Sequence, residues 1–410
     1  MFYHTLPNGI KIVFEQLPTA ITSCGIIVDC GSRDEANDEL GIAHFIEHLL
    51  FKGTQKRNAR QIINRIENVG GDINAFTTKE ETVVYCSVLS EYTERAFELI
   101  GDIVLHSVFD EKEIEKERAV ILDEICSYKD SPSELIFDDF EEQIFNNHLG
   151  HNILGTQKTL RKIKSEQIKK FYQTNYLPEK IVFFIVGNFD FTKIVRWTEK
   201  YFVFNNNFFI QNNNNLKANF RIKPEFHNPS TKIFKKKTHQ VHCILGNVAY
   251  SYHHSNRLAF SLLNNILGGP NMNSLLNLEL REKHALVYQV DANYQPFTDT
   301  GVWTVYFGCD KSNAERCENF VRKQLQKLCD KPLNDNILRK YKLQFFGQVA
   351  IANSVNETRA LTIGKTFLRF GEVQTFAQFR AEIEKITSQQ LQTVANEVFN
   401  QKEISVLRYI

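Results

Sequence analysis

The segment "GIAHFIEHLLFKG", residues 41–53, places two imidazoles and one carboxylate on a single predicted helix. His44 and His48 are four residues apart, and at 100° per residue this spacing puts both rings on one face, where they can bind one divalent ion. Glu47 directly precedes the second histidine, so its carboxylate can hold a water molecule beside the ion without binding the ion itself. The pattern therefore predicts metal-assisted hydrolysis. The alternative is two ordinary histidines and a solvated glutamate on an amphipathic helix.

A catalytic zinc ion takes three protein ligands and keeps a fourth position for water. The segment "EKERAVILDEICSYKD" offers two candidates for the third ligand, Glu117 and Glu124, on one stripe of a second predicted helix. Seven residues correspond to about 10.5 Å along a helix axis, so both carboxylates are not expected to bind one ion directly. One of them is expected to be a ligand, and the other at most to contact a ligand from behind.

The motif H-x-x-E-H resembles that of the inverted-motif zinc peptidases, a family that includes pitrilysin, insulin-degrading enzyme and the mitochondrial processing peptidase. In this family the glutamate ligand lies far along the chain, and the resemblance selects Glu124, 76 residues after His48. It implies one zinc ion per chain, bound by His44, His48 and Glu124, with Glu117 as the accompanying acidic residue. It also implies a metalloendopeptidase in which Glu47 takes a proton from the attacking water and passes it to the leaving amine.

A further segment, "GGDINAFTTKEET", resembles the family's edge strand, at Asn74, Ala75, Phe76 and Thr77. An edge strand presents unpaired N–H and C=O groups, so an extended peptide can be held by main-chain bonds that ignore side-chain identity. The resemblance therefore implies that these four residues bind substrate, and that the substrates are peptides or unfolded polypeptide segments.

The segment "LREKHALVYQV" resembles another element of the family, a separated arginine and tyrosine, at Arg281 and Tyr288. By residue type alone they are a helix-surface arginine and a strand tyrosine. The resemblance implies instead a catalytic role, in which both donors stabilise the oxyanion that develops on the scissile carbonyl.

The chain divides near its middle, where the Asn-rich segment 204–230 has neither a helical nor a strand period. The two sides resemble each other, since "IKSEQIKKFYQTNYLPEKIVFF" from Ile163 and "ITSQQLQTVANEVFNQKEISVL" from Ile386 align at one constant offset, each as a helix running into a strand. We therefore predict three parts: a zinc-bearing peptidase domain in residues 1–205, an Asn-rich linker in 206–228 and a homologous domain in 229–410.

The coarse pattern of the first domain mixes strands and helices without strict βαβ alternation. It predicts strands near 8–15, 22–30, 72–77 and 82–89, and helices near 58–69, 91–107 and 110–129 besides the one that carries the histidines. The predicted fold class is therefore α+β, with two homologous αβ domains, each a largely antiparallel sheet packed with helices.

The second domain has Phe260, Leu263 and Asn264 in the positions of the zinc motif, so it has no zinc site of its own. The family's working unit is four such domains in a hollow clamshell, and this chain would supply half of it. The resemblance implies a pair of chains, with a homodimer as the simpler arrangement and Arg281 and Tyr288 acting across the chamber. The alternatives are the catalytic half of a heterodimer, or a non-catalytic peptide-binding or scaffold subunit, which the retained zinc residues disfavour.

Composition and charge limit the classes of partner that we expect this protein to bind. The 410 residues carry 49 Lys and Arg against 48 Asp and Glu, and this net charge of +1 gives no reason to expect nucleic acid or an anionic membrane as partner. No run approaches the roughly 18 apolar residues of a membrane helix and the start lacks a signal-peptide pattern, so a cytoplasmic protein with no membrane partner is expected. The eight cysteines include no C-x-x-C pair, which predicts reduced thiols.

Overall fold

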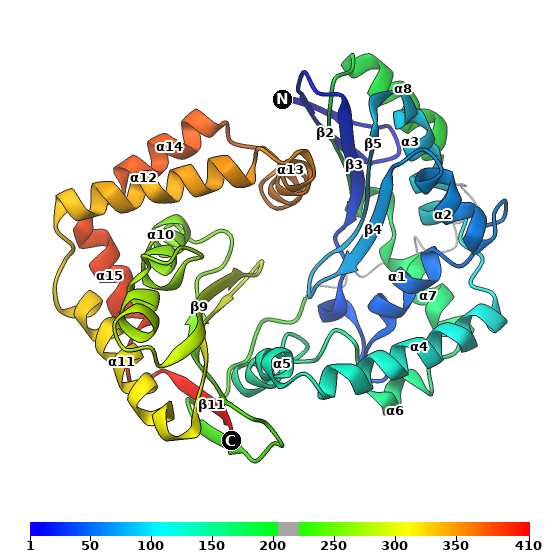
Figure 1. Ribbon diagram of the computed structural model, residues 1–410. Helices are drawn as coiled ribbons and strands as arrows, with labels where there is room; N and C mark the ends of the chain where they lie inside the picture. The colour runs from blue at the N-terminus through cyan, green and yellow to red at the C-terminus, as the bar shows by residue number, and fades with distance from the viewer. Residues whose placement is uncertain (204–220) are drawn as a thin grey trace. The chain divides into compact units, whose positions relative to one another are not determined.

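The computed structural model describes residues 1–203 and 221–410, which form two compact units (Figure 1). The first unit comprises Met1–Cys126, His151–Ile222 and Ile351–Val373, and the second comprises Ser127–Gly150, Lys223–Ala350 and Gln374–Ile410. Most of the predicted linker, residues 206–220, lies outside the described residues. The compact units do not follow the order of the sequence, because each of them also takes a segment from the other side of the linker. The predicted domain boundaries along the sequence stay a prediction.

The first unit is built on a six-stranded sheet in the order β1-β2-β6-β3-β5-β4. Its strands are β1 (Phe2–Thr5), β2 (Lys11–Gln16), β3 (Ile21–Val28), β4 (Asp72–Thr77), β5 (Thr82–Leu89) and β6 (Ile181–Gly187). β2 and β6 pair in parallel, and every other neighbouring pair is antiparallel. β3 and β6 are almost entirely buried, as expected for apolar strands that are covered on both faces. β4 lies at the edge of the sheet.

Helices cover both faces of this sheet. On one face α1 (Ile42–Leu50), α2 (Ala59–Glu67) and α3 (Thr93–Leu105) contact β3, β4 and β5. On the other face α13 (Asn356–Phe370) packs against β3 and β6, and its residues Ile363 and Phe367 share a buried cluster with Val83 and Phe184. The unit also holds α6 (Gln157–Leu160), α7 (Ser165–Asn175), α8 (Phe191–Tyr201) and the greater part of α4 (Glu111–Lys129).

The second unit has a five-stranded sheet in the order β7-β11-β8-β10-β9. Its strands are β7 (Thr231–Phe234), β8 (Val241–Ala249), β9 (Val287–Pro296), β10 (Gly301–Cys309) and β11 (Ser405–Tyr409). Its helices include α5 (Pro132–Ile144), α10 (Arg257–Gly268), α11 (Ala314–Asp330), α14 (Phe376–Lys385), α15 (Ser388–Val398) and the greater part of α12 (Asp335–Ala352).

The two sheets repeat one topology. The order β2-β6-β3-β5-β4 corresponds strand for strand to β7-β11-β8-β10-β9, and in both sheets the first pair is parallel and the other pairs are antiparallel. In both units a helix leads into the second strand of this order, α7 into β6 and α15 into β11, at the offset seen in the sequence. The predicted α+β class and the duplication are therefore confirmed.

Each unit includes one helix from the other half of the sequence. α5, from the first half, packs on β8 and β11, whereas α13, from the second half, packs on β3 and β6. The two helices hold corresponding places in the repeat, since each follows a long helix, α4 or α12.

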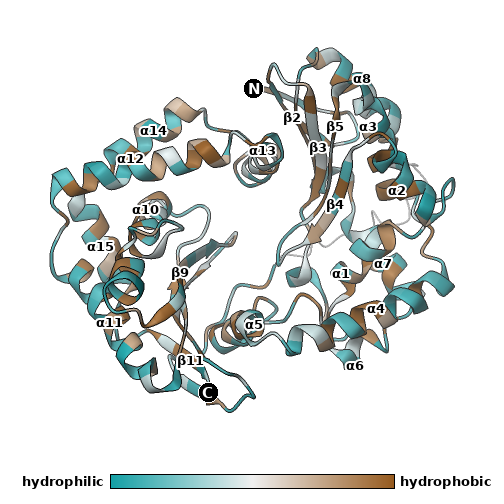
Figure 2. Cartoon of the chain, viewed as in Figure 1, coloured by the Kyte–Doolittle hydropathy of each residue, from teal (hydrophilic) through white to brown (hydrophobic). Residues whose placement is uncertain are grey.

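Figure 2 shows teal and brown residues alternating along the helices, as expected for helices that bury one face.

Within residues 1–203 and 221–410, no helix has both the length and the hydrophobicity that a membrane span requires. All eight cysteines are free thiols, and all but Cys126 are buried.

Candidate metal centre

The helix α1 begins at a turn that requires glycine. Gly41 has φ 94°, and a Cβ at this position would lie 2.6 Å from the carbonyl oxygen of Leu154. One side of the helix packs into the core through five large apolar residues, Ile42, Phe45, Ile46, Leu49 and Leu50. At 100° per residue the motif residues His44, Glu47 and His48 then lie on the opposite side.

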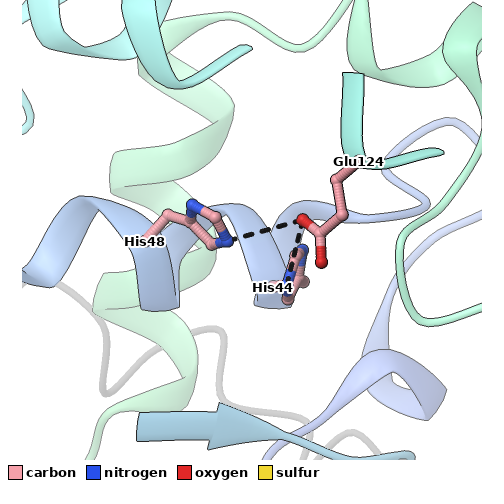
Figure 3. A group of neighbouring side chains, drawn as sticks. All are labelled: His44, His48 and Glu124. Carbon is pink, nitrogen blue, oxygen red and sulfur yellow. Dashed lines mark ion pairs between the residues drawn. The ribbon is translucent and has the colours of Figure 1, made fainter. Parts of the chain in front are cut away.

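The structure brings His44, His48 and Glu124 together (Figure 3). Nε2 of His44 lies 4.0 Å from Oε2 of Glu124, and Nε2 of His48 lies 3.7 Å from the same oxygen. The histidines come from α1 and the glutamate from α4. One ligand atom from each residue lies within 4.8 Å of the other two, and in the described part of the chain this is the one group of His, Cys, Asp or Glu side chains that could hold a metal ion.

The positions of these atoms fit a zinc ion. Tetrahedral zinc with bonds of about 2.0 to 2.2 Å separates its ligand atoms by about 3.3 to 3.6 Å. The separations of 3.7 and 4.0 Å to Glu124 exceed that range by a few tenths of an ångström, which small side-chain rotations can supply. Two nitrogens and one oxygen leave the fourth position open, as in catalytic zinc sites.

Glu117 contacts His48 from behind. Its Oε2 lies 3.1 Å from Nδ1 of His48, and its Oε1 lies 2.8 Å from Nζ of Lys52. A carboxylate at Nδ1 keeps the proton on that nitrogen, which leaves Nε2 with a lone pair for the ion. Helical spacing alone left open which glutamate is the ligand. In the structure Glu124 faces both Nε2 atoms and Glu117 faces Nδ1.

Burial keeps His44 neutral. Burial in the first place, and the neighbouring His48 in the second, lower the pKa of His44 to about 3. A neutral imidazole is the form that binds a metal ion. Nδ1 of His44 is buried and has no hydrogen-bond partner among the described residues, so packing rather than a carboxylate orients this ring.

Glu47 lies beside the histidine pair and is held by β4. The hydroxyl of Thr77 donates a hydrogen bond of 2.8 Å to Oε2 of Glu47. Burial raises the pKa of Glu47 and the charge of Glu124 adds to the rise, whereas the bond from Thr77 and the nearby His48 oppose it. A raised pKa brings a carboxyl group closer to neutral pH, where a general base must both accept and release a proton.

The residues Asn74, Ala75, Phe76 and Thr77 form the end of β4. β4 pairs with β5 on one side, and no strand of the described residues pairs with its other side. The main-chain groups of that other side are the ones to which a peptide strand can add. The contact from the Thr77 side chain to Glu47 was not predicted, because the sequence pattern indicated only a main-chain role for this residue.

Arg281 and Tyr288 lie in the second unit. Arg281 belongs to the short helix Asn277–Glu282, and its side chain is 43% exposed, with Nε 3.9 Å from a carboxylate oxygen of Glu282. Tyr288 lies on β9, the edge strand that corresponds to β4, and is 85% exposed. Their role in oxyanion stabilisation stays a prediction.

The corresponding helix of the second unit, α10, uses the motif positions for packing. Phe260 and Leu263 are buried. Asn264 donates a hydrogen bond of 3.0 Å to the carbonyl oxygen of Ala292 and accepts one of 3.1 Å from Nε1 of Trp303. The position of the second metal-binding histidine is thus occupied by a side chain that cross-links the sheet and its helix.

Two residues near the site were missed in the sequence. Glu35 is buried, and its two carboxylate oxygens accept hydrogen bonds of 2.8 and 2.9 Å from the N–H groups of Gly41 and Ala43, so it holds the first turn of α1. No local spacing links Glu35 to that helix. Lys52 follows His48 by four residues, and this helical spacing was a signal that could have placed it on the same face.

Comparison with known proteins points the same way. Residues 11–157 match the family model described as Insulinase (Peptidase family M16), and residues 162–345 match the model described as Peptidase M16 inactive domain. A protein of Bacillus subtilis named uncharacterized zinc protease YmxG is 31% identical over 401 residues, which cover 97% of this chain and 95% of that protein. An uncharacterized zinc protease of Streptomyces coelicolor is 33% identical over 410 residues, which cover 97% of this chain and 87% of that protein.

Two solved structures share the fold over the whole chain. A protease from Helicobacter pylori superposes with a TM-score of 0.92 at 22% identity and covers 100% of this chain and 99% of that one. A Pseudomonas fluorescens protein described as a peptidase M16 inactive domain superposes with a TM-score of 0.88 at 17% identity and covers 100% and 97%. At these identities the likeness establishes the fold.

Proposed function

The chain belongs to the insulinase family of zinc proteases, peptidase family M16, and we propose that it is an active endopeptidase that hydrolyses peptides or unfolded polypeptide segments. Its cofactor is zinc, as the names of its relatives state. The observation that carries the proposal is the position of Glu47, a carboxylate that lies beside the His44, His48 and Glu124 group and is hydrogen-bonded by Thr77.

The residues of the site provide the proton transfers that peptide hydrolysis needs. Zinc bound by His44, His48 and Glu124 supplies Lewis acidity, which polarises a carbonyl group and makes a water molecule more acidic. Glu47 accepts a proton from that water as the water oxygen bonds to the scissile carbonyl carbon. The same carboxyl group then gives the proton to the leaving amine nitrogen as the C–N bond breaks. The bond from Thr77 holds the carboxylate in one orientation during both transfers.

The edge strand β4 supports a peptide as the substrate. A strand that adds beside Asn74–Thr77 is held through its main chain, at the strand end that contacts Glu47. Main-chain binding requires an extended segment and is insensitive to side-chain identity, so short or unfolded chains are preferred over folded proteins.

The experiment that tests this function is cleavage of a quenched fluorescent peptide library by the purified chain, with and without a chelator, together with a measurement of bound metal. We expect about one zinc per chain and chelator-sensitive cleavage. Glu47→Gln should retain the zinc and lose the cleavage. Glu115→Gln is the matched control on α4, because that side chain is 69% exposed, and it should behave as wild type. Bound zinc without any cleavage, or no bound zinc, would contradict the proposal.

We further propose that the active form is a cytoplasmic homodimer in which Arg281 and Tyr288 of one chain stabilise the oxyanion at the zinc centre of the other. The exposure of Tyr288 supports this, since its hydroxyl is free to meet a ligand. Mixing Glu47→Gln chains with Tyr288→Phe chains should restore activity that neither variant has alone, because one site of the mixed dimer is intact. A mixture no more active than its components, or an active enzyme that is monomeric, would refute the proposal that these residues act at the zinc centre of the other chain.

A further inference from the structure

The loop of residues 29–35 contacts both α1, which carries Glu47, and the turn that follows β4, the strand of Thr77. At one end Glu35 accepts hydrogen bonds from the first turn of α1, the helix of Glu47. In the middle of the loop the N–H of Ser32 donates a bond of 3.1 Å to the carbonyl oxygen of Thr78. Thr78 begins the turn 78–81 between β4 and β5. The loop therefore sets the position of that turn relative to α1.

The turn 78–81 in turn fixes the hydroxyl that holds Glu47. Thr77 is the last residue of β4 and directly precedes the turn, which is closed by a 2.8 Å bond from the N–H of Thr78 to the carbonyl oxygen of Glu81. The hydroxyl of Thr77 lies 2.8 Å from Oε2 of Glu47. Because a hydrogen bond weakens steeply beyond this distance, a shift of the turn by an ångström would break the contact.

A cluster of eight charged side chains joins this loop and this turn to two distant parts of the chain. The charge cluster consists of four acidic and four basic residues: Asp29, Asp34, Glu80, Glu81, Arg33, Arg221, Lys365 and Arg369. The formal charges of these eight residues cancel. Glu80 and Glu81, in the turn, have side chains only 3% and 5% exposed.

Two arginines make the long-range connections. Arg369, near the end of α13, lies 3.0 Å from both Asp29 and Glu81, with its side chain 5% exposed. Arg221 lies 3.0 Å from both Asp29 and Asp34, and it donates a 2.8 Å bond to the carbonyl oxygen of Glu80. Arg221 lies within the predicted linker and Arg369 in the second half of the sequence, yet both belong to the compact unit that contains the metal centre.

We propose that Arg369 and Arg221 are positioning residues for the general base, which act by holding the turn 78–81 so that the Thr77 hydroxyl stays on Glu47. Removing Arg369 leaves the buried carboxylate of Glu81 with Lys365 as its only ion-pair partner among the described residues. Removing Arg221 takes from the buried side chain of Asp34 the cation 3.0 Å away. A buried carboxylate with fewer cations around it is relieved by local movement that lets water in. The turn carries two of the carboxylates of the cluster, Glu80 and Glu81, so a rearrangement of the cluster displaces it. This inference rests on the proposed function, since it concerns the base of that reaction.

A purely structural role for the cluster is the alternative, and the chain provides a matched control for it. Arg359 lies on the same helix as Arg369 and forms a two-bond ion pair with Glu15, at 2.6 and 2.9 Å, with side chains 14% and 18% exposed. Glu15 belongs to β2 and lies outside the charge cluster. Arg359→Met therefore removes a comparable ion pair from α13 without releasing the turn.

The test compares kcat, KM, bound zinc and melting temperature for Arg369→Met, Arg359→Met, Thr77→Val and the double variant Arg369→Met/Thr77→Val. Arg369→Met should lower kcat about 10- to 100-fold with zinc retained, because displaced catalytic groups cost rates of this order. KM should stay within about threefold, since the loss is in the chemical step. Arg359→Met should lower the melting temperature to a similar degree and change kcat less than about threefold.

The double variant tests whether Arg369 affects kcat through the Thr77 hydroxyl. If Arg369 acts through the Thr77 hydroxyl, then Arg369→Met in the Thr77→Val background should lower kcat by less than about twofold further, because the contact is already lost. Effects that multiply in the double variant, or equal kcat values for Arg369→Met and Arg359→Met, would overturn the inference. If Arg369→Met does not fold, Arg221→Met replaces it with the same expectations. A wild-type chain that binds zinc but cleaves nothing would instead contradict the proposed function itself.

Discussion

Removing Glu117 should weaken zinc binding through His48. The carboxylate accepts the proton of Nδ1 at 3.1 Å, and without it the imidazole can rotate or take the other tautomer. Loss of such a partner lowers metal affinity about 10- to 100-fold, which corresponds to about 1.4 to 2.7 kcal/mol. We expect roughly tenfold for Glu117→Gln, whose amide oxygen can still accept from Nδ1, and roughly 100-fold for Glu117→Ala, as measured by competition with a chromogenic chelator.

The second partner of Glu117 separates this effect from a loss of stability. Glu117→Ala leaves the ammonium group of Lys52, 2.8 Å away in the wild type and 32% exposed, without its anion. Lys52→Met in the Glu117→Ala background should recover part of the lost melting temperature, because it removes that unpaired charge. It should not recover zinc affinity. If Glu117→Ala binds zinc as tightly as wild type, packing alone orients His48 and the reasoning is wrong.

Three further predictions concern stability. Burial raises the pKa of Glu35 to about 8 in the folded chain, against 4.5 when the side chain is exposed. Between pH 4.5 and about 8 the folded state therefore holds a proton that the unfolded state has released, and the unfolding free energy falls as the pH rises through this range. Urea titrations should show this loss, at most about 5 kcal/mol, in wild type and its absence in Glu35→Gln. Gly41→Ala should cost about 2 to 3 kcal/mol in the same assay because of the positive φ and the close Leu154 oxygen, whereas Gly53→Ala, with ordinary Cβ contacts at 3.6 and 3.8 Å, should cost less than half of that. Chelation should lower the unfolding free energy of wild type by the contribution of bound zinc, about 2.7 kcal/mol at a free zinc concentration of 100 times Kd, and with it the melting temperature, whereas Glu124→Ala should be unchanged.

Much of the fold could be predicted because it follows local patterns. The expected strands at 72–77 and 82–89 coincide with β4 and β5, and the helix expected near 110–129 is α4 at Glu111–Lys129. β5 is rich in Val and other residues that favour strands, α4 has Ile114, Ile121 and Ile125 at helical spacing, and a Gly-Gly pair marks the turn before β4. β1, at Phe2–Thr5, was missed because all four of its residues are exposed, so no apolar pattern marks it.

For the metal centre too, the features set by a single helix could be predicted, whereas those set by tertiary packing could not. The spacing of His44 and His48 is a property of one helix, and the sequence therefore placed both rings correctly on one face. The choice between Glu117 and Glu124 depends on how α4 lies against α1, which no local spacing contains. The contact of Thr77 with Glu47 joins residues 30 apart in the sequence, and for the same reason it was not predicted. Glu35 is only six residues from Gly41, but the irregular segment between them has no period that indicates the contact.

The helix α13 shows why the second half of the sequence is not a structurally separate domain. It lies beyond residue 345, where the match to the inactive-domain model ends, and it packs on the sheet of the unit that contains the metal centre. Without it a face of β3 and β6, including Ile27 and Phe184, would be exposed, and the burial of such side chains contributes roughly 1.5 to 3 kcal/mol each. Periodicity reveals that a helix buries one side, but not which sheet it covers. The second half lacks the metal ligands at the corresponding positions, yet one of its helices is part of the unit that contains them.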